Sequence, residues 1–100
     1  MTTAPFLLAG TMLTGSATAT IHSPYDGTVV GHAGLASRAD VEAAIDAAVS
    51  SARAAADLPS HARAAVLVRI AGALDARKEE MARLLAAEAG KPVGLARVEI

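Results

Sequence analysis

Apolar and polar positions divide the chain into an N-terminal part with short strand-like runs and a C-terminal part with helical spacing. Apolar residues at 6–8 and 11–13 flank Ala9-Gly10, which predicts a tight hairpin. Residues 17–22 and 28–33 flank Pro24-Tyr25-Asp26-Gly27. There the proline presets φ and the glycine accepts the positive φ that closes a turn, so we predict a second hairpin.

A pairing of Ser23 with Thr28 would fix the register of this second hairpin. Ile21 would then lie opposite Val30 on one face, and His22 opposite Val29 on the other. In this register His22 and His32 point to opposite faces, so they cannot share a metal. Because an isolated sheet of this size is only marginally stable in water, we expect it to pack against a larger body of protein.

Helical spacing begins after Ser37, whose side chain can cap a first helix with Asp40 in its first turn. This helix is predicted to end by about Asp57, because Leu58 precedes a proline. Ser60 is predicted to cap a second helix. Its apolar stripe breaks at Arg77-Lys78, which indicates either a bend or two helices over about 61–76 and 78–89.

Gly90 is a natural left-handed end for the last of these helices, and Pro92 suits the first turn of another. The stretch from Val93 to Ile100 then shows no signal that ends a helix. We therefore expect these residues to be the N-terminal part of a longer chain. The pattern as a whole predicts an α+β arrangement, with a β-meander or hairpin followed by three to four helices.

Composition narrows the possible functions. The chain is 53% hydrophobic, but Phe6 and Tyr25 are its only aromatic residues, and its net charge is −1. Acidic and basic residues are interspersed along the chain and do not form a basic patch. This argues against binding to nucleic acid and against binding to an anionic membrane surface. The absence of cysteine excludes disulfides, thiolate metal sites and a cysteine nucleophile within these 100 residues, and it fits a cytoplasmic location. The first 25 residues lack the positive start of a signal peptide.

Residue chemistry alone predicts no catalytic constellation. The three histidines are scattered without metal-ligand spacing. Glu79-Glu80 beside Arg77-Lys78 is most simply a solvated helix face. Glycines 27, 31 and 34 do not form the strand-to-helix glycine pattern that holds phosphate. We therefore predict no catalytic and no cofactor-binding residue within this chain.

The order of the signals nevertheless resembles a known family. A Ser-Pro-x-x-Gly turn at 23–27 is followed by Leu35-Ala36-Ser37-Arg38-Ala39-Asp40 and an Arg63-x-x-Val66-Leu67 stretch. Glu88-Ala89-Gly90-Lys91-Pro92 and Ala96-Arg97-x-Glu99-Ile100 come last. Together they resemble the N-terminal segment of the aldehyde dehydrogenase superfamily, from about Phe6 to Ile100.

The resemblance implies an NAD- or NADP-dependent enzyme that oxidises a small aldehyde to the acid. In that family a cysteine thiolate attacks the carbonyl, hydride passes to the nicotinamide, and a glutamate activates water. All of these residues lie downstream of the present segment. Residues 1–35 would belong to the oligomerisation region, and residues 36–100 to the outer helices of the cofactor-binding domain. The parent would be a cytoplasmic homo-oligomer, a dimer or tetramer.

Two finer expectations follow from the resemblance. Many members bind a structural monovalent cation, and the matching positions here are Ile21, His22 and Glu99. Glu99 can equally be a helix-surface carboxylate, which is the interpretation we favour. The Tyr25-Asp26 pair resembles members that act on anionic aldehydes, of the lactaldehyde or phosphono type.

A different class of function uses the same residues. Apolar stripes show that a face is buried, but they do not show against what. The chain could therefore be a stand-alone helical module that binds another protein and has no catalytic activity.

Overall fold

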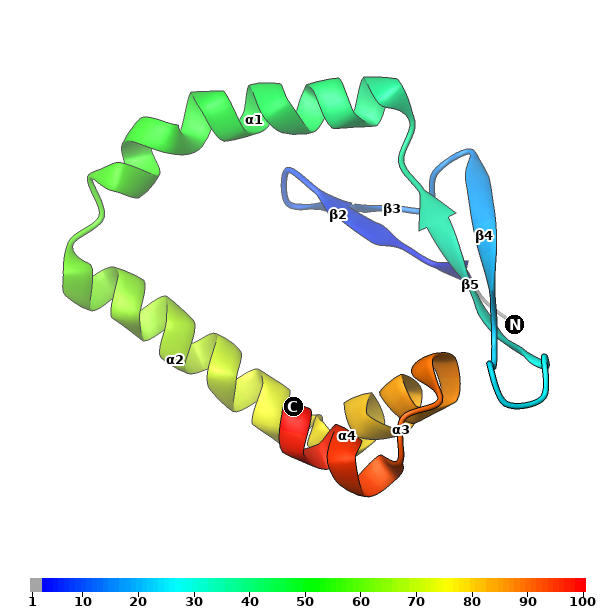
Figure 1. Cartoon of the computed structure of the whole chain (residues 1–100). Coiled ribbons are helices and arrows are strands. Elements are labelled where there is room, and N and C mark those ends of the chain that lie inside the picture. Colours follow the sequence, from blue (N-terminus) through cyan, green and yellow to red (C-terminus); the bar gives the residue numbers. More distant parts are fainter. Residues whose placement is uncertain (1–2) are drawn as a thin grey trace. The chain divides into compact units, whose positions relative to one another are not determined.

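The computed structural model describes residues 3–100, with five strands followed by four helices (Figure 1). The α+β arrangement predicted from the sequence is confirmed, with four helices. The chain forms two compact units. The first comprises residues up to His22 and residues 29–57, and the second comprises residues 23–28 and 58–100. The assignment of 1–35 and 36–100 to two functional regions remains a prediction.

Strands β2 (Phe6–Leu8) and β3 (Thr11–Leu13) form the first predicted hairpin, with Phe6 opposite Leu13. Ala9 and Gly10 join them, with φ of 48° and 84°. Positive φ at both central residues is the conformation whose twist matches that of the flanking strands. Ala9 adopts it although its Cβ makes this less favourable than for the glycine.

The second sheet has the order β1-β5-β4. Strands β4 (Ala17–His22) and β5 (Val29–Leu35) are antiparallel, as predicted. Strand β1 (Thr3–Ala4) pairs with β5 in parallel, a contact that the hairpin pattern did not indicate. Gly34 on β5 lies so close to the Thr14 carbonyl oxygen that an added Cβ would be 2.3 Å from it. Only glycine fits there.

The predicted register is correct at the turn and wrong one residue further on. The Ser23 amide donates to the Thr28 carbonyl, and His22 lies opposite Val29. The register then shifts, and Ile21 pairs with Gly31 rather than with Val30. Val30 is thus the additional residue of a bulge, a distortion that leaves no clear mark in an alternating sequence.

The same shift corrects the predicted placement of the histidines. His32 lies opposite Thr20, and Thr20 Oγ1 is 3.2 Å from His32 Nδ1. Alternate residues of a strand share a face, so His22 lies on the same side as Thr20 and His32. The prediction that His22 and His32 face opposite ways is therefore wrong. Among residues 3–100, no three His, Cys, Asp or Glu side chains are grouped so that they could bind a metal ion.

Helix α1 (Arg38–Ala56) begins as predicted. The Ser37 hydroxyl oxygen accepts from the Asp40 amide, and the Asp40 carboxylate accepts from the Ser37 amide, so that each residue satisfies a free group of the other. The hydroxyl of Ser37 also donates to this carboxylate, which lowers the pKa of Asp40. The helix ends before Asp57, within one residue of its expected end.

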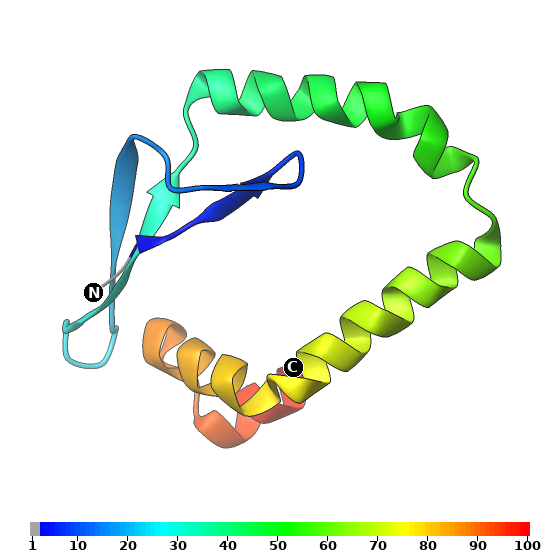
Figure 2. The same ribbon diagram turned by 180° about the vertical axis from the view of Figure 1, so that it is seen from behind.

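The C-terminal helices are α2 (Ser60–Ala76), α3 (Lys78–Ala89) and α4 (Val93–Glu99). Ser60 is the first residue of α2 and not its cap, because Pro59 occupies the cap position and makes no side-chain cap bond. The break in the stripe at Arg77-Lys78 separates two helices. Helices α3 and α4 contact each other, as Figure 2 shows from behind.

Little of the chain is enclosed by its own residues. Within the described part, only Ala82 of α3 and Ala96 of α4 are buried, both with no exposed surface. Both belong to the α3–α4 pair. None of the helices in residues 3–100 is long and apolar enough to cross a membrane.

Candidate functional site

An apolar groove lies along α1 in the first unit. Strand β2 contributes Phe6, Leu7 and Leu8, and α1 contributes Val41 and Ile45 together with smaller side chains. The groove encloses about 340 Å³. Val41, Ile45 and Val49 follow one another at single-turn spacing and remain 50%, 57% and 72% exposed. These three side chains form an apolar face of α1 that the described chain leaves largely exposed.

Serines continue this surface toward the end of α1. A second hollow, lined in part by Leu7, Ala47 and Ser51, adjoins the first. The Ser51 hydroxyl donates to the Ala47 carbonyl oxygen at 2.8 Å, and the Ser50 hydroxyl donates to the same oxygen at 3.0 Å. These hydroxyls bond back to their own helix, a common arrangement for serine within helices.

Helix α2 also exposes large apolar side chains. Like α1, it has no buried residue, but its polar and apolar faces are less clearly separated than those of α1. Its exposed apolar residues are Val66, Leu67, Val68, Ile70 and Leu74. A surface of this extent on a single helix is typical of an element that packs against other protein.

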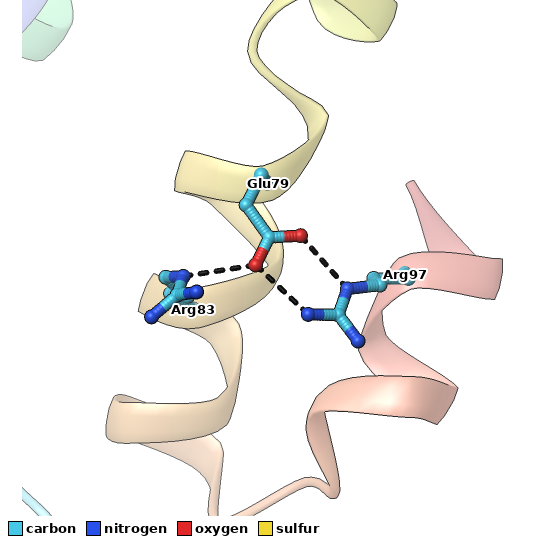
Figure 3. A network of polar contacts seen from close by, with 3 residues as sticks. All are labelled: Glu79, Arg83 and Arg97. Carbon is cyan, nitrogen blue, oxygen red and sulfur yellow. Dashed lines mark hydrogen bonds and ion pairs between the residues drawn. The ribbon is translucent and has the colours of Figure 1, made fainter.

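Ion pairs join α3 to α4 in the second unit (Figure 3). Arg97 of α4 donates from Nε to Glu79 Oε2 at 2.8 Å and from Nη2 to Oε1 at 2.9 Å. Arg83, one turn along α3, donates from Nε to Glu79 Oε1 at 2.9 Å. One carboxylate thus accepts from two guanidinium groups. The hydrogen bonds from Arg97 and then from Arg83 lower the pKa of Glu79 to about 2.

Two further ion pairs lie near the ends of α3 and α4. Arg77 donates to Glu80 from both Nε and Nη2, at 3.0 and 2.7 Å. These bonds lower the pKa of Glu80 and raise that of Arg77. Lys91, between the two helices, pairs with Glu99 at the end of α4. The short helix α4 is therefore joined to the start of α3 by the bonds from Arg97 to Glu79. It is joined to the loop that precedes it by the ion pair of Lys91 with Glu99.

The turn at residues 23–28 is ordered by its own side chains. The Asp26 carboxylate accepts from the Thr28 amide at 3.1 Å and from the Thr28 hydroxyl at 2.8 Å, and these bonds lower the pKa of Asp26. The Gly27 amide donates to the Ser23 carbonyl oxygen at 2.9 Å. Tyr25 extends from this turn with 93% of its surface exposed.

The residues proposed for a monovalent cation lie in different units. Ile21 and His22 end β4 in the first unit, and Glu99 ends α4 in the second. The cation site therefore stays a prediction. Glu99 has an ion-pair partner in Lys91, which agrees with the alternative of a helix-surface carboxylate.

One part of the Glu79 network could be predicted from residue spacing. Glu79 and Arg83 are four residues apart on a helix, a spacing that predicts an ion pair. Arg97 is 18 residues from Glu79, and only the packing of α4 against α3 brings it near. The interpretation of Glu79 as part of a solvated face is therefore incomplete, because this side chain joins two helices.

Comparison with known proteins places these features in a family. The model of the "Aldehyde dehydrogenase family" matches residues 12–100. A lactaldehyde dehydrogenase of Methanocaldococcus jannaschii is 37% identical over 78 residues, which are 78% of this chain and 17% of that protein.

Solved structures give the same result. An NAD-dependent benzaldehyde dehydrogenase from Corynebacterium glutamicum superposes with a TM-score of 0.88 at 32% identity, over 96% of this chain and 21% of that one. Aldehyde dehydrogenase 21 from Physcomitrella patens, in complex with the product succinate, gives 0.92 at 34% identity, over 97% and 20%. The chain thus spans about a fifth of the length of these proteins. It belongs to the aldehyde dehydrogenase family.

Proposed function

We propose that this chain is the N-terminal part of an NAD- or NADP-dependent aldehyde dehydrogenase, which oxidises a small aldehyde to the acid. The observation that carries the proposal is the family match over residues 12–100, together with a TM-score of 0.92 over 97% of the chain. One of the similar structures is named as NAD-dependent. That name supports a nicotinamide cofactor, which would accept hydride from the substrate.

We propose that residues outside this chain bind the nicotinamide cofactor, and the first turns of α1 and α3 support this. Phosphates bind where helix amides are free, but the first turn of α1 is already occupied by the Ser37 hydroxyl and the Asp40 carboxylate. Glu79 and Glu80 likewise give the first turn of α3 a negative charge. The chain also has no cysteine that could attack an aldehyde. Catalysis would therefore require residues that this chain does not contain.

We propose a packing role for this segment within the enzyme. The apolar faces of α1 and α2 would be covered by the remaining four fifths of an aldehyde dehydrogenase chain. The relatives' length supplies this occupant, since a segment of the same fold lies within chains about five times as long. Each large aliphatic side chain contributes about 1.5–3 kcal/mol when it is fully buried, so these faces could anchor the segment firmly.

The substrate is proposed as a small, anionic aldehyde of the lactaldehyde or phosphono type. The name of the lactaldehyde dehydrogenase relative supports this, as does the Tyr25-Asp26 pair in the turn. We also propose that the parent protein is a homo-oligomer. The cytoplasmic location predicted from the sequence remains a prediction.

The test is an activity assay on the complete gene product. Purified protein would be mixed with NAD⁺ or NADP⁺ and with lactaldehyde, a phosphonoaldehyde and benzaldehyde, and reduced cofactor would be followed by absorbance. We expect aldehyde-dependent reduction that disappears after a thiol-blocking reagent is added. No reduction with any of these aldehydes would contradict the proposal.

A second measurement distinguishes the alternative of a binding module. An independent module should unfold cooperatively as residues 1–100, with a midpoint that does not depend on protein concentration. A segment that needs the rest of an enzyme should associate through its exposed apolar faces or remain loosely packed. A sharp, concentration-independent transition would favour the binding module.

A further inference from the structure

Gly90 ends α3 at a point where the backbone and a neighbouring ring both restrict the residue. Its φ is 68°, in the left-handed region, and its amide donates to the Ala86 carbonyl oxygen at 3.0 Å. This is a usual end for a helix, and it favours glycine. The backbone requirement alone would also accept asparagine at moderate cost.

The neighbouring ring belongs to Pro24. A Cβ built on Gly90 would lie 2.9 Å from Pro24 Cγ, with Pro24 Cβ and Cδ at 3.9 and 4.0 Å. Carbon atoms in contact prefer about 3.5–4.0 Å, so any side chain at residue 90 would require one of the two segments to move. The turn at 23–28 and α3 belong to the same compact unit.

Pro24 cannot easily move away from such a side chain. Its ring is closed on the backbone, so Cγ can shift only through a change of ring pucker and cannot rotate away from residue 90. The turn that carries it is held by the bond from the Ser23 amide to Thr28 at 2.8 Å and by the Asp26 bonds to Thr28. We therefore expect any relief of the clash beyond a change of ring pucker to displace the turn as a whole.

We infer that the Pro24 ring packs directly on the Cα of Gly90, and that this contact holds the 23–28 turn against the corner between α3 and α4. Residue 90 must be glycine for two separable reasons, the left-handed backbone and the adjacent ring. This inference concerns positioning within the segment and does not depend on the proposed enzymatic activity.

The test compares Gly90→Ala with Gly10→Ala in the complete gene product. Gly10 also has a positive φ, 84°, but an added Cβ there meets nothing within 4 Å. Gly10→Ala therefore measures the effect of the left-handed backbone alone, which we expect to raise the local opening equilibrium constant about five- to 30-fold. Hydrogen exchange followed by mass spectrometry reports this equilibrium for each peptide.

We expect Gly90→Ala to increase exchange around residue 90 by about tenfold more than Gly10→Ala increases it in its own hairpin. Pro24→Ala removes Cγ and Cδ, so in the Gly90→Ala background it should reverse most of this excess. Equal effects of the two glycine substitutions, or no recovery with Pro24→Ala, would overturn the inference. If Gly90→Ala does not fold, Gly90→Asn serves in both backgrounds, since asparagine tolerates this backbone but still carries a Cβ.

Proteolysis gives a readout that backbone strain at residue 90 would not change. Tyr25 lies on the turn and is 93% exposed, so chymotrypsin can cut there once the turn is displaced. We expect cleavage after Tyr25 to be several-fold faster in Gly90→Ala than in the parent, and unchanged in Gly10→Ala. Cleavage at the parent rate in Gly90→Ala would show that the turn is not held by this contact.

Discussion

Replacement of Ala82 by leucine tests how closely α3 and α4 are packed. Ala82 and Ala96 have no exposed surface, and they are the buried residues of the described chain. Alanine at such positions allows two helices to approach closely. Leucine adds three carbon atoms where no space is open to solvent, so side chains must leave their preferred rotamers or the helices must separate.

We expect Ala82→Leu to lower the free energy of local opening of α3 and α4 by about 1–3 kcal/mol, the usual range for an overpacked core position. A cost of this size corresponds to roughly a five- to 150-fold increase in local opening. Hydrogen exchange of peptides from α3 and α4 in the complete gene product would measure it. Ala87→Leu is the matched control, because Ala87 lies on the same helix but is exposed. Leucine is nearly as good a helix former as alanine.

The reasoning predicts a difference between two chemically identical substitutions on one helix. Exchange in α3 and α4 should be faster in Ala82→Leu and close to that of the parent in Ala87→Leu. If the two variants exchange alike, the helices have room at Ala82, and the close packing described for this pair is incorrect.

Three other predictions can be tested separately. Glu79→Gln should lower thermal stability at neutral pH. Because folding lowers the pKa of Glu79 from 4.5 to about 2, the carboxylate stabilises the protein fully above pH 4.5, and this stabilisation is lost as the pH falls toward 2. A stability difference between parent and variant that does not change with pH would contradict this. Val30→Asp should reduce the oligomeric mass of the complete protein in light scattering more than it alters helix content; an unchanged mass would exclude the hairpin from subunit contacts. Purified residues 1–100 should reduce no NAD⁺ or NADP⁺ with any aldehyde, because they contain no cysteine; reduction that follows the purified segment would refute this.

Local signals were sufficient to predict most of the secondary structure. Turn residues at 9–10 and 24–27 located both hairpins, and Ser37, Pro59 and Gly90 marked helix boundaries to within one or two residues. These signals act through the backbone of a few neighbouring residues, so they can be read without the fold. The break in spacing at Arg77-Lys78 also located the boundary between α2 and α3, although it left a bend in one helix as an alternative.

Features that depend on distant residues were not predicted. The bulge at Val30, the parallel pairing of β1 with β5 and the bonds from Arg97 to Glu79 all join segments that only the folded chain brings together. The contact of Pro24 with Gly90 is of the same kind, although both residues carried local signals. The candidate cation residues illustrate the limit most clearly, because backbone carbonyl ligands have no side-chain signature.

The serine hydroxyls near the end of α1 affect how readily this surface can be covered. A polar group that enters an apolar interface usually loses its bonds to water and needs a new partner. Ser51 already donates to the Ala47 carbonyl oxygen at 2.8 Å, so its hydrogen bond would survive the removal of solvent. An aliphatic segment could therefore cover this end of α1 without offering any hydrogen-bonding group. The retained hydrogen bond lowers the desolvation cost of this part of the helix, so that an apolar partner on the valines and isoleucine of α1 can extend over it.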